Sequence, residues 1–376
     1  MSLFIQGIGT AVPEYSIAQE DAAEIAREVH DYTPDQKRLL PVLYRRAGVR
    51  TRYSVVLHTD TGPLNGRQSF FPPEVDSGRQ GPSTGARMAK YEASAGKLAT
   101  AAAARAISDA GVEAHHVTDL ITVSCSGFYS PGFDITLVRD LPLSNSVTRT
   151  HVGFMGCQGA LNALRVARAL TTVNREACVL ICCVELCSLH HQYAWDPERM
   201  VANALFADGA AALVCRGVPG ARPTNCEATP IASRTWEVVS NGTTIVPETT
   251  DAMSWRIGDN GFQMTLSARV PELIHHSLRP WLAEWLSGHE LTPDSVPTWG
   301  IHPGGPKILS ACLESLGFPK ERLADSFEVL SEFGNMSSPT VLFILDRLRR
   351  RNAATPCVLL GFGPGLTIEA GLLRAN

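Results

Sequence analysis

Three polar residues of this chain, Cys157, His302 and Asn335, each adjoin glycine-rich sequence and are of types that together can handle an acyl group. A cysteine thiolate is a nucleophile that can hold an acyl group as a thioester. Imidazole and carboxamide groups can donate hydrogen bonds to a developing oxyanion. The residue types therefore predict covalent acyl chemistry, provided that the fold brings the three side chains to one pocket.

Cys157 lies between Gly156 and the run Gln158-Gly159-Ala160, where a predicted strand over 148–154 ends and a helix begins. The positive end of that helix, with its unpaired amides, favours a thiolate over a thiol. The glycines let a substrate carbonyl approach backbone amides that can stabilise a tetrahedral oxyanion. A buried core cysteine is the alternative interpretation.

His302 is followed by Pro303-Gly304-Gly305-Pro306, which fixes the backbone and predicts a helix from Pro306 onward. Such a turn holds the imidazole in place, although a structural histidine is the other interpretation. Asn335 follows Gly334 and precedes Met336-Ser337-Ser338-Pro339. Its side chain either caps a helix or points its NH2 into the site as an oxyanion donor.

Cysteine, histidine and asparagine together suit a decarboxylative Claisen condensation better than peptide hydrolysis. The thiolate holds the acyl group, and the two donors stabilise the enolate that forms when a malonyl thioester loses CO2. No general base is needed, because the departing CO2 generates the carbanion. Papain-like proteases use the same three types, but there the asparagine orients the histidine. Here each residue follows a turn of its own.

The elements that position these residues alternate between apolar strand-like runs and helices, which predicts a layered α/β core. Their order recurs, and the expected counterparts are 148–154 with 326–333, 120–126 with 298–301, and 179–184 with 357–361. We therefore expect a duplicated αβαβα fold whose halves are residues 1–220, with the cysteine, and 221–376, with the histidine and asparagine. Within the first half, the segment 55–85 is rich in Gly, Pro, Ser and Asp and predicts a long surface excursion, either functional or an ordinary insertion.

Composition narrows the class of protein further. With 376 residues, 44% hydrophobic, the chain can bury a large core, and its net charge of -4 gives no basic surface for nucleic acid. Apolar runs such as 177–184 are far shorter than the roughly 20 residues of a membrane span, and polar residues interrupt the start of the chain. We expect a cytoplasmic protein without a membrane span.

The ten cysteines lie mostly in apolar segments and predict reduced, buried thiols. Cys182 and Cys183 with Cys187 could suggest a zinc cluster, but adjacent residues of a strand point to opposite faces. We expect no metal and no cofactor.

Taken together, these residues resemble the type III polyketide synthases, the chalcone synthase-like branch of the thiolase superfamily, from Gly7 to the C-terminus. The most specific stretches are 156–160 (GCQGA), 204–211 (ALFADGAA), 302–306 (HPGGP), 334–338 (GNMSS) and 361–367 (GFGPGLT). The resemblance implies that Cys157 is loaded with a starter acyl group from coenzyme A. It also implies that His302 assists thiolate formation and, with Asn335, binds the thioester carbonyl of malonyl-CoA.

The resemblance assigns further roles. Phe206 matches the gatekeeping phenylalanine between the CoA tunnel and the reaction cavity, and it could otherwise be a core aromatic. The cavity-lining positions fall on Cys125, Cys187, His190, Gly261 and Ser337. Plant members have threonine at the first three, so the resemblance points to the bacterial branch and to an aliphatic starter. A medium or long fatty acyl-CoA, extended to an alkylpyrone or alkylresorcinol, is the expected chemistry.

For coenzyme A, the resemblance implies contacts from Arg46, Gly304, Gly305 and Lys307, and a guanidinium suits phosphate geometry. A solvated helix face is the other interpretation of Arg46. The family is homodimeric, and this chain has Ser130 where plant members place a methionine in the partner's cavity. Two rivals remain: a ketoacyl synthase III-like enzyme performing one condensation with an acyl carrier protein, and a non-catalytic acyl-CoA-binding scaffold.

Overall fold

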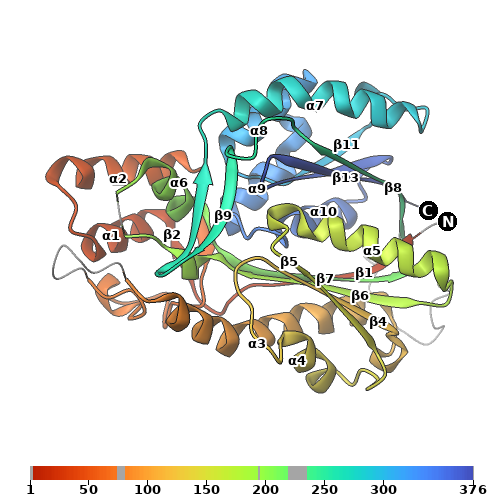
Figure 1. Cartoon of the computed structure of the whole chain (residues 1–376), viewed down its shortest axis with the longest axis horizontal. Coiled ribbons are helices and arrows are strands. Elements are labelled where there is room, and N and C mark those ends of the chain that lie inside the picture. Colours follow the sequence, from red (N-terminus) through yellow and green to blue (C-terminus); the bar gives the residue numbers. More distant parts are fainter. Residues whose placement is uncertain (1–2, 74–80, 194, 219–234, 376) are drawn as a thin grey trace.

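The fold is built on nine strands that form one hydrogen-bonded sheet, in the order β11-β12-β13-β8-β1-β7-β6-β4-β5 (Figure 1). The computed structural model describes residues 3–73, 81–193, 195–218 and 235–375. The strands of this sheet are β1 (Leu3–Ala11), β4 (Asp119–Ser124), β5 (Thr148–Gly153), β6 (Cys178–Leu186), β7 (Asp208–Arg216), β8 (Trp236–Ile245), β11 (Thr298–Ile301), β12 (Cys357–Gly363) and β13 (Thr367–Ala375). Two small sheets pair β2 (Ser16–Ala18) with β3 (Thr51–Tyr53) and β9 (Met253–Gly258) with β10 (Gly261–Leu266).

The sheet shows the duplication in its strand directions. In the first half β4 and β6 are parallel, while the pairs β6–β7 and β7–β1 are antiparallel. In the second half β11 and β12 are parallel, while β12–β13 and β13–β8 are antiparallel. The two sets of four strands therefore have the same order and the same directions, as the recurrence in the sequence predicts.

Helices divide the structure into layers (Figure 1). The central layer holds α5 (Gly159–Val173) and α10 (Thr340–Arg350), which share one hydrophobic core with residues from strands of both halves. The outer layers hold α3 (Thr84–Ala110) with α4 (Phe133–Asp140), and α7 (Val270–Ser287) with α8 (Pro306–Leu316), each with its own core. The two halves of the one sheet form the two β layers on either side of α5 and α10. The arrangement is therefore the αβαβα layering expected from the sequence.

A fourth core lies beside these layers. It packs α1 (Gln19–Val29), α2 (Pro34–Arg46) and α6 (Pro197–Leu205) against Leu330 of α9 (Ala324–Phe333). The C-terminal residue of α6 adjoins Phe206, so this side cluster supports one wall of the site described below.

One expectation about the duplication is wrong. Residues 326–333 are not a strand but most of the helix α9, and within the described part of the chain the second half has no counterpart of β5. The physical reason is visible in the burial pattern, because Ser326, Val329 and Leu330 are buried at the spacing of a helix face. Asn335 therefore follows the helix α9 and the turn at Gly334 rather than a strand.

The excursion over 55–85 is only partly what the sequence predicts. Its described residues contain little regular structure beyond a single 3-10 turn at Leu64–Gly66, but Val56, Leu57 and Phe71 are buried. The segment thus contributes to the interior as well as to the surface. Residues 74–80 and the expected domain boundary at 220/221 lie outside the described residues.

Candidate active site

Cys157, His302 and Asn335 line one pocket, although they come from three separate turns of the chain. The pocket occupies about 450 Å³ and its wall is otherwise almost entirely apolar. The remaining lining residues are Ala202, Leu205, Phe206, Met253, Met264, Leu266, Gly304, Ile308 and Phe362. The three residues selected from the sequence for acyl chemistry therefore face a common space.

The turn that presents Cys157 requires glycine at Gly156. This residue has φ of +78°, and a Cβ on it would lie 2.6 Å from Cδ of Pro364. The turn continues as a 3-10 segment, Gly156–Gln158, directly into α5, and the Gln158 amide donates to Thr367 Oγ1 at 2.6 Å. The nucleophile thus sits at a helix start that is anchored to the opposite half of the molecule.

Burial dominates the charge states of the site. It raises the pKa of the Cys157 thiol to about 11, although hydrogen bonds from the Ser337 and Asn335 side chains act in the opposite direction. Burial also lowers the pKa of His302 to about 3. Burial therefore acts against the thiolate that the helix start favours.

His302 is positioned to change this balance. Its side chain is 1% exposed, and neither ring nitrogen has a hydrogen-bond partner within the described residues. A proton that passes from the thiol to this imidazole leaves an ion pair without changing the net charge of the pocket. The attraction within that pair would oppose the cost of burying the two charges.

The Asn335 side chain is oriented by the backbone of Ser337. Its Oδ1 accepts a hydrogen bond from the Ser337 N–H at 2.8 Å, which leaves the NH2 for the pocket. The next helix, α10, begins only at Thr340, so Asn335 is not its cap. The backbone of Asn335 also bridges to that of Phe206 in a parallel pair, which connects the amide donor with the pocket wall.

Two of the predicted cavity residues, Cys125 and Ser337, lie beside Cys157. The Cys125 sulfur is 3.2 Å from Ser337 Oγ, and the Ser337 side chain hydrogen-bonds Cys157. Neither residue lines the two pockets described for this region. They form the layer of side chains next to the nucleophile.

Glu185 is a residue of this layer that sequence reasoning missed. It is fully buried and accepts hydrogen bonds from the backbone N–H groups of Cys125 and Ser126 and from the hydroxyls of Ser126 and Ser338. The available signal was a lone carboxylate within the apolar strand run 178–186. Glu185 ties segments of both halves together behind the site.

A second, larger pocket of about 880 Å³ adjoins the first and shares Ala202, Phe206 and Met264 with it. Cys187 and His190, two of the residues expected to line the cavity, line this second pocket. Its other apolar lining comes from β2, from α1 and from the excursion after β3, namely Ile17, Ala22, Ile25, Ala26, Val29, Val56, Leu57 and Phe71. This apolar extension has no counterpart among the motifs of the sequence.

An aromatic wall separates the second pocket from the region around Cys125. His190 donates from Nε2 to the Ser126 carbonyl at 2.6 Å and accepts at Nδ1 from the Phe262 N–H at 2.9 Å, so the neutral tautomer is fixed. Its ring stacks on Phe262 at 4.2 Å, and the Trp255 indole donates to the Cys125 carbonyl at 2.7 Å. The side chains in this wall are rigidly held.

Gly261 does not line either pocket, contrary to the prediction. It has φ of +97° at the start of β10, and a Cβ on it would lie 2.7 Å from Nη1 of the buried Arg87. The next residue, Phe262, lines the second pocket as part of the aromatic wall.

The residues predicted to contact coenzyme A are dispersed around the turn before α8. Gly304 lines the pocket with Cys157, and Gly305 packs beside Leu205. Lys307 lines a separate surface groove between α7 and α8, and Arg46 is exposed at the C-terminal end of α2. Only one of the four, therefore, borders the catalytic pocket itself.

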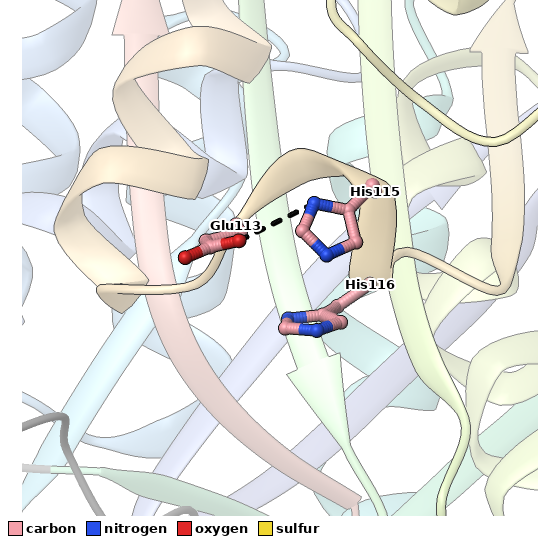
Figure 2. A group of neighbouring side chains, drawn as sticks. All are labelled: Glu113, His115 and His116. Atoms are coloured by element: carbon pink, nitrogen blue, oxygen red, sulfur yellow. Dashed lines mark ion pairs between the residues drawn. The ribbon is translucent and has the colours of Figure 1, made fainter.

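Side chains of metal-ligand type gather elsewhere in the described ranges. Glu113, His115 and His116 are exposed, and their ligand atoms lie within 4.8 Å of one another, with Glu113 and His115 paired at 3.3 Å (Figure 2). This group precedes the amino end of β4, whereas Cys125 follows its carboxyl end. The trio is therefore not part of the acyl site.

Cysteines in the described residues are all free, and all except Cys157 are buried. Cys182 and Cys183 point into the cores on opposite faces of β6, as expected for neighbours in a strand. In the same ranges no helix is long and apolar enough to cross a membrane.

Known proteins resemble this chain in both sequence and fold. Residues 2–219 and 237–376 match the N-terminal and C-terminal domains of the chalcone and stilbene synthases. The chain is 32% identical over 374 residues to the alpha-pyrone synthesis polyketide synthase-like Pks18 of Mycobacterium tuberculosis, covering 98% of this chain and 90% of that protein. The crystal structure of PKS-I from the brown alga Ectocarpus siliculosus is 33% identical, with a TM-score of 0.86 over 100% of this chain and 98% of the other.

A bacterial structure is similar as well. The 1,3,6,8-tetrahydroxynaphthalene synthase of Streptomyces coelicolor, a type III polyketide synthase, is 28% identical, with a TM-score of 0.83 over 98% of each chain. A duplicated, layered α/β fold of this kind defines a condensing enzyme of the thiolase type. The chain belongs to the chalcone and stilbene synthase family, the type III polyketide synthases. It is an acyl-transferring enzyme that condenses an acyl-CoA with malonyl-CoA, and the resemblance recognised in the sequence is confirmed.

Proposed function

We propose that this enzyme loads a medium or long fatty acyl group from coenzyme A onto Cys157 and extends it with malonyl-CoA to an alkylpyrone or alkylresorcinol. The single observation that carries this proposal is the common pocket of Cys157, His302 and Asn335 with an apolar extension beyond Phe206. A fatty chain needs such an apolar space, because exposing its methylenes to water is unfavourable by about 0.8 kcal/mol each.

In the loading step His302 accepts the proton of Cys157, and the thiolate attacks the acyl thioester. The free coenzyme A thiol then leaves with a proton. In the extension step the thioester carbonyl of malonyl-CoA lies against His302 and the Asn335 NH2. These donors stabilise the enolate as CO2 departs, and the enolate carbon attacks the acyl carbon on Cys157; the carbon–sulfur bond to Cys157 then breaks, which restores the thiolate and leaves the extended chain as a β-ketoacyl-CoA.

The second pocket supports an aliphatic starter. Its apolar lining includes small and branched residues of α1 together with Val56, Leu57 and Phe71. His190, Trp255 and Phe262 form the aromatic wall, and hydrogen bonds hold its side chains in place. This wall limits the space for the growing polyketide beside the nucleophile. A long tail and a short polyketide portion are what pyrones and resorcinols with alkyl chains contain. The similarity to a protein described by alpha-pyrone synthesis agrees with this choice.

The test is product analysis with the purified enzyme, malonyl-CoA and a panel of acyl-CoA starters from hexanoyl to octadecanoyl. We expect alkylpyrones or alkylresorcinols by mass spectrometry, formed most efficiently from the longer starters. A lone diketide that forms only on a carrier protein would instead favour a ketoacyl synthase III-like enzyme. Binding of acyl-CoA without any product would favour a non-catalytic scaffold.

We also propose that the enzyme works in the cytoplasm as a homodimer. The edge strand β5 is exposed along its length, and an unpaired edge is a surface that proteins normally cover. Phe128, Phe154 and Met155 are 51%, 39% and 39% exposed, and the rings of Phe128 and Phe154 are 6.1 Å apart. Light scattering should give twice the chain mass, and Phe154→Glu should lower it; a monomeric wild type would refute the dimer.

A further inference from the structure

The outer face of α2 carries an apolar pair within a basic stripe. Leu39 and Val42 are 54% and 37% exposed. Around them, at the spacing of one helix face, lie Arg38, Arg45 and Arg46. We refer to these five residues as the α2 face. The opposite side of the helix is buried against α6, so the α2 face is oriented toward solvent.

The charge on this face is opposite to that of the whole chain. The stripe contains three arginines and a single acidic residue, Asp35, which pairs with Arg38. The chain as a whole has a net charge of -4. An acidic partner is therefore repelled by the molecule in general and attracted here, which gives orientation as well as affinity.

The α2 face adjoins the turn that forms part of the catalytic pocket. The helix ends at Arg46, and the next turn contains Gly48, on which a Cβ would lie 2.7 Å from Cγ of Pro306. Pro306 begins α8, and the flanking Gly304 and Ile308 line the pocket that contains Cys157. A partner seated on the α2 face is thus next to the turn that forms one wall of this pocket.

Coenzyme A alone does not account for this surface. Its phosphates need cations such as Arg46, but a small nucleotide does not need two exposed aliphatic side chains one helix turn apart. An apolar centre with a charged rim is the composition of a protein docking site. The partner that combines negative charge, an apolar helix surface and a phosphopantetheine thioester is an acyl carrier protein.

We propose that the α2 face docks an acidic, phosphopantetheine-bearing acyl carrier protein, which delivers the starter acyl group directly to Cys157. The transfer is a thioester exchange: the Cys157 sulfur bonds to the acyl carbon, the carbon–sulfur bond to the pantetheine arm breaks, and the departing thiolate takes up a proton. Malonyl-CoA still supplies the extender units. The inference rests on the proposed function, because it concerns loading of the same cysteine.

The experiment compares dodecanoyl-CoA with the same acyl group on a bacterial holo-acyl carrier protein of fatty acid synthesis, with malonyl-CoA in both assays. We expect the wild type to use both starters. Leu39→Glu and Arg45→Glu should lower kcat/KM for the carrier-bound starter at least about tenfold and for dodecanoyl-CoA less than about twofold. The control is Val173→Glu on α5, a side chain that is 90% exposed on another helix and should change neither value. Added salt should weaken use of the carrier more than use of the coenzyme A thioester.

Several results would overturn the docking proposal while leaving the proposed function intact. A wild type that uses dodecanoyl-CoA and ignores the carrier-bound starter refutes it. Equal losses for both starters in the two variants would assign the α2 face to folding or to coenzyme A binding. A change in oligomeric mass of Leu39→Glu would make the face a contact between copies of this chain. If dodecanoyl-CoA itself yields no product, the proposed function fails, and fluorescence anisotropy of the labelled holo-carrier still measures whether it binds the α2 face.

Discussion

Replacing His302 by glutamine tests whether the buried thiol depends on the imidazole for its ionisation. Burial raises the pKa of Cys157 to about 11, and His302 is the pocket residue able to take its proton. Without the imidazole, at pH 8, a thiol with that pKa is a thiolate in about one molecule in a thousand. A cysteine paired with a protonated histidine has a pKa between about 3.5 and 7.5 and is largely thiolate at the same pH.

The thiolate of lower pKa is also the weaker nucleophile, with a Brønsted slope of about 0.4–0.5; for a paired cysteine at the upper end of the pKa range, about 7.5, this reduces the thousandfold advantage to about ten- to thirtyfold. We therefore expect His302→Gln to slow alkylation of Cys157 by iodoacetamide at pH 8 at least about tenfold. Because a higher thiol pKa leaves less thiolate at any given pH, the pH profile of the alkylation rate moves to higher pH in the variant.

The assay is peptide mass spectrometry of Cys157 after timed alkylation between pH 6 and 10. Cys157 is half-buried, whereas the other cysteines of the described residues are fully buried, which makes its labelling selective among them. His116→Gln, which replaces an exposed histidine away from the pocket, is the matched control and should leave the profile unchanged. Superimposable profiles for the wild type and His302→Gln would refute the coupling of the two groups.

Three further substitutions have defined outcomes. Asn335→Ala should slow decarboxylation of malonyl-CoA about a hundredfold, measured by CO2 release, and slow acyl loading far less; equal losses would make Asn335 a structural residue. Phe206→Ala removes the ring shared by the two pockets and should raise the kcat/KM ratio of hexadecanoyl-CoA to hexanoyl-CoA at least about threefold; an unchanged ratio contradicts a gating role. Glu185→Ala leaves buried donors unpaired and should lower the free energy of unfolding by about 3 kcal/mol or more in denaturant titrations, whereas a loss under about 1 kcal/mol would argue against its structural role.

Much of the layered fold follows from local sequence. The alanines of α3 predict close packing, and the backbone of β1 does approach this helix: a Cβ on Gly9 would lie 2.2 Å from the Ala102 carbonyl oxygen. The strands β6 and β12 consist almost entirely of apolar residues and glycine, apart from Glu185, which is the pattern of a strand buried on both faces. The strand predicted over 326–333 was wrong because the prediction assumed that the two halves match at every step, although the apolar spacing of these residues is helical.

The site was predictable where a residue type and a turn coincide, as at Cys157, His302 and Asn335. The ionisation of Cys157 was not predictable, because it depends on burial and on which side chains of other segments reach the sulfur. Pocket shape was equally inaccessible: the apolar extension is made by α1 and the excursion after β3, which converge on Phe206 only in the folded molecule. Gly261 was misassigned because a glycine position does not reveal on which side of a wall its backbone lies.

The central claim is that Cys157 carries the acyl group within a pocket shared with His302 and Asn335. Intact-protein mass spectrometry after incubation with dodecanoyl-CoA, followed by peptide mapping, tests it most directly. We predict one dodecanoyl group per chain, on Cys157, and no acylation of Cys157→Ala. An acyl group on another cysteine, or acylation that survives the substitution, would contradict the account.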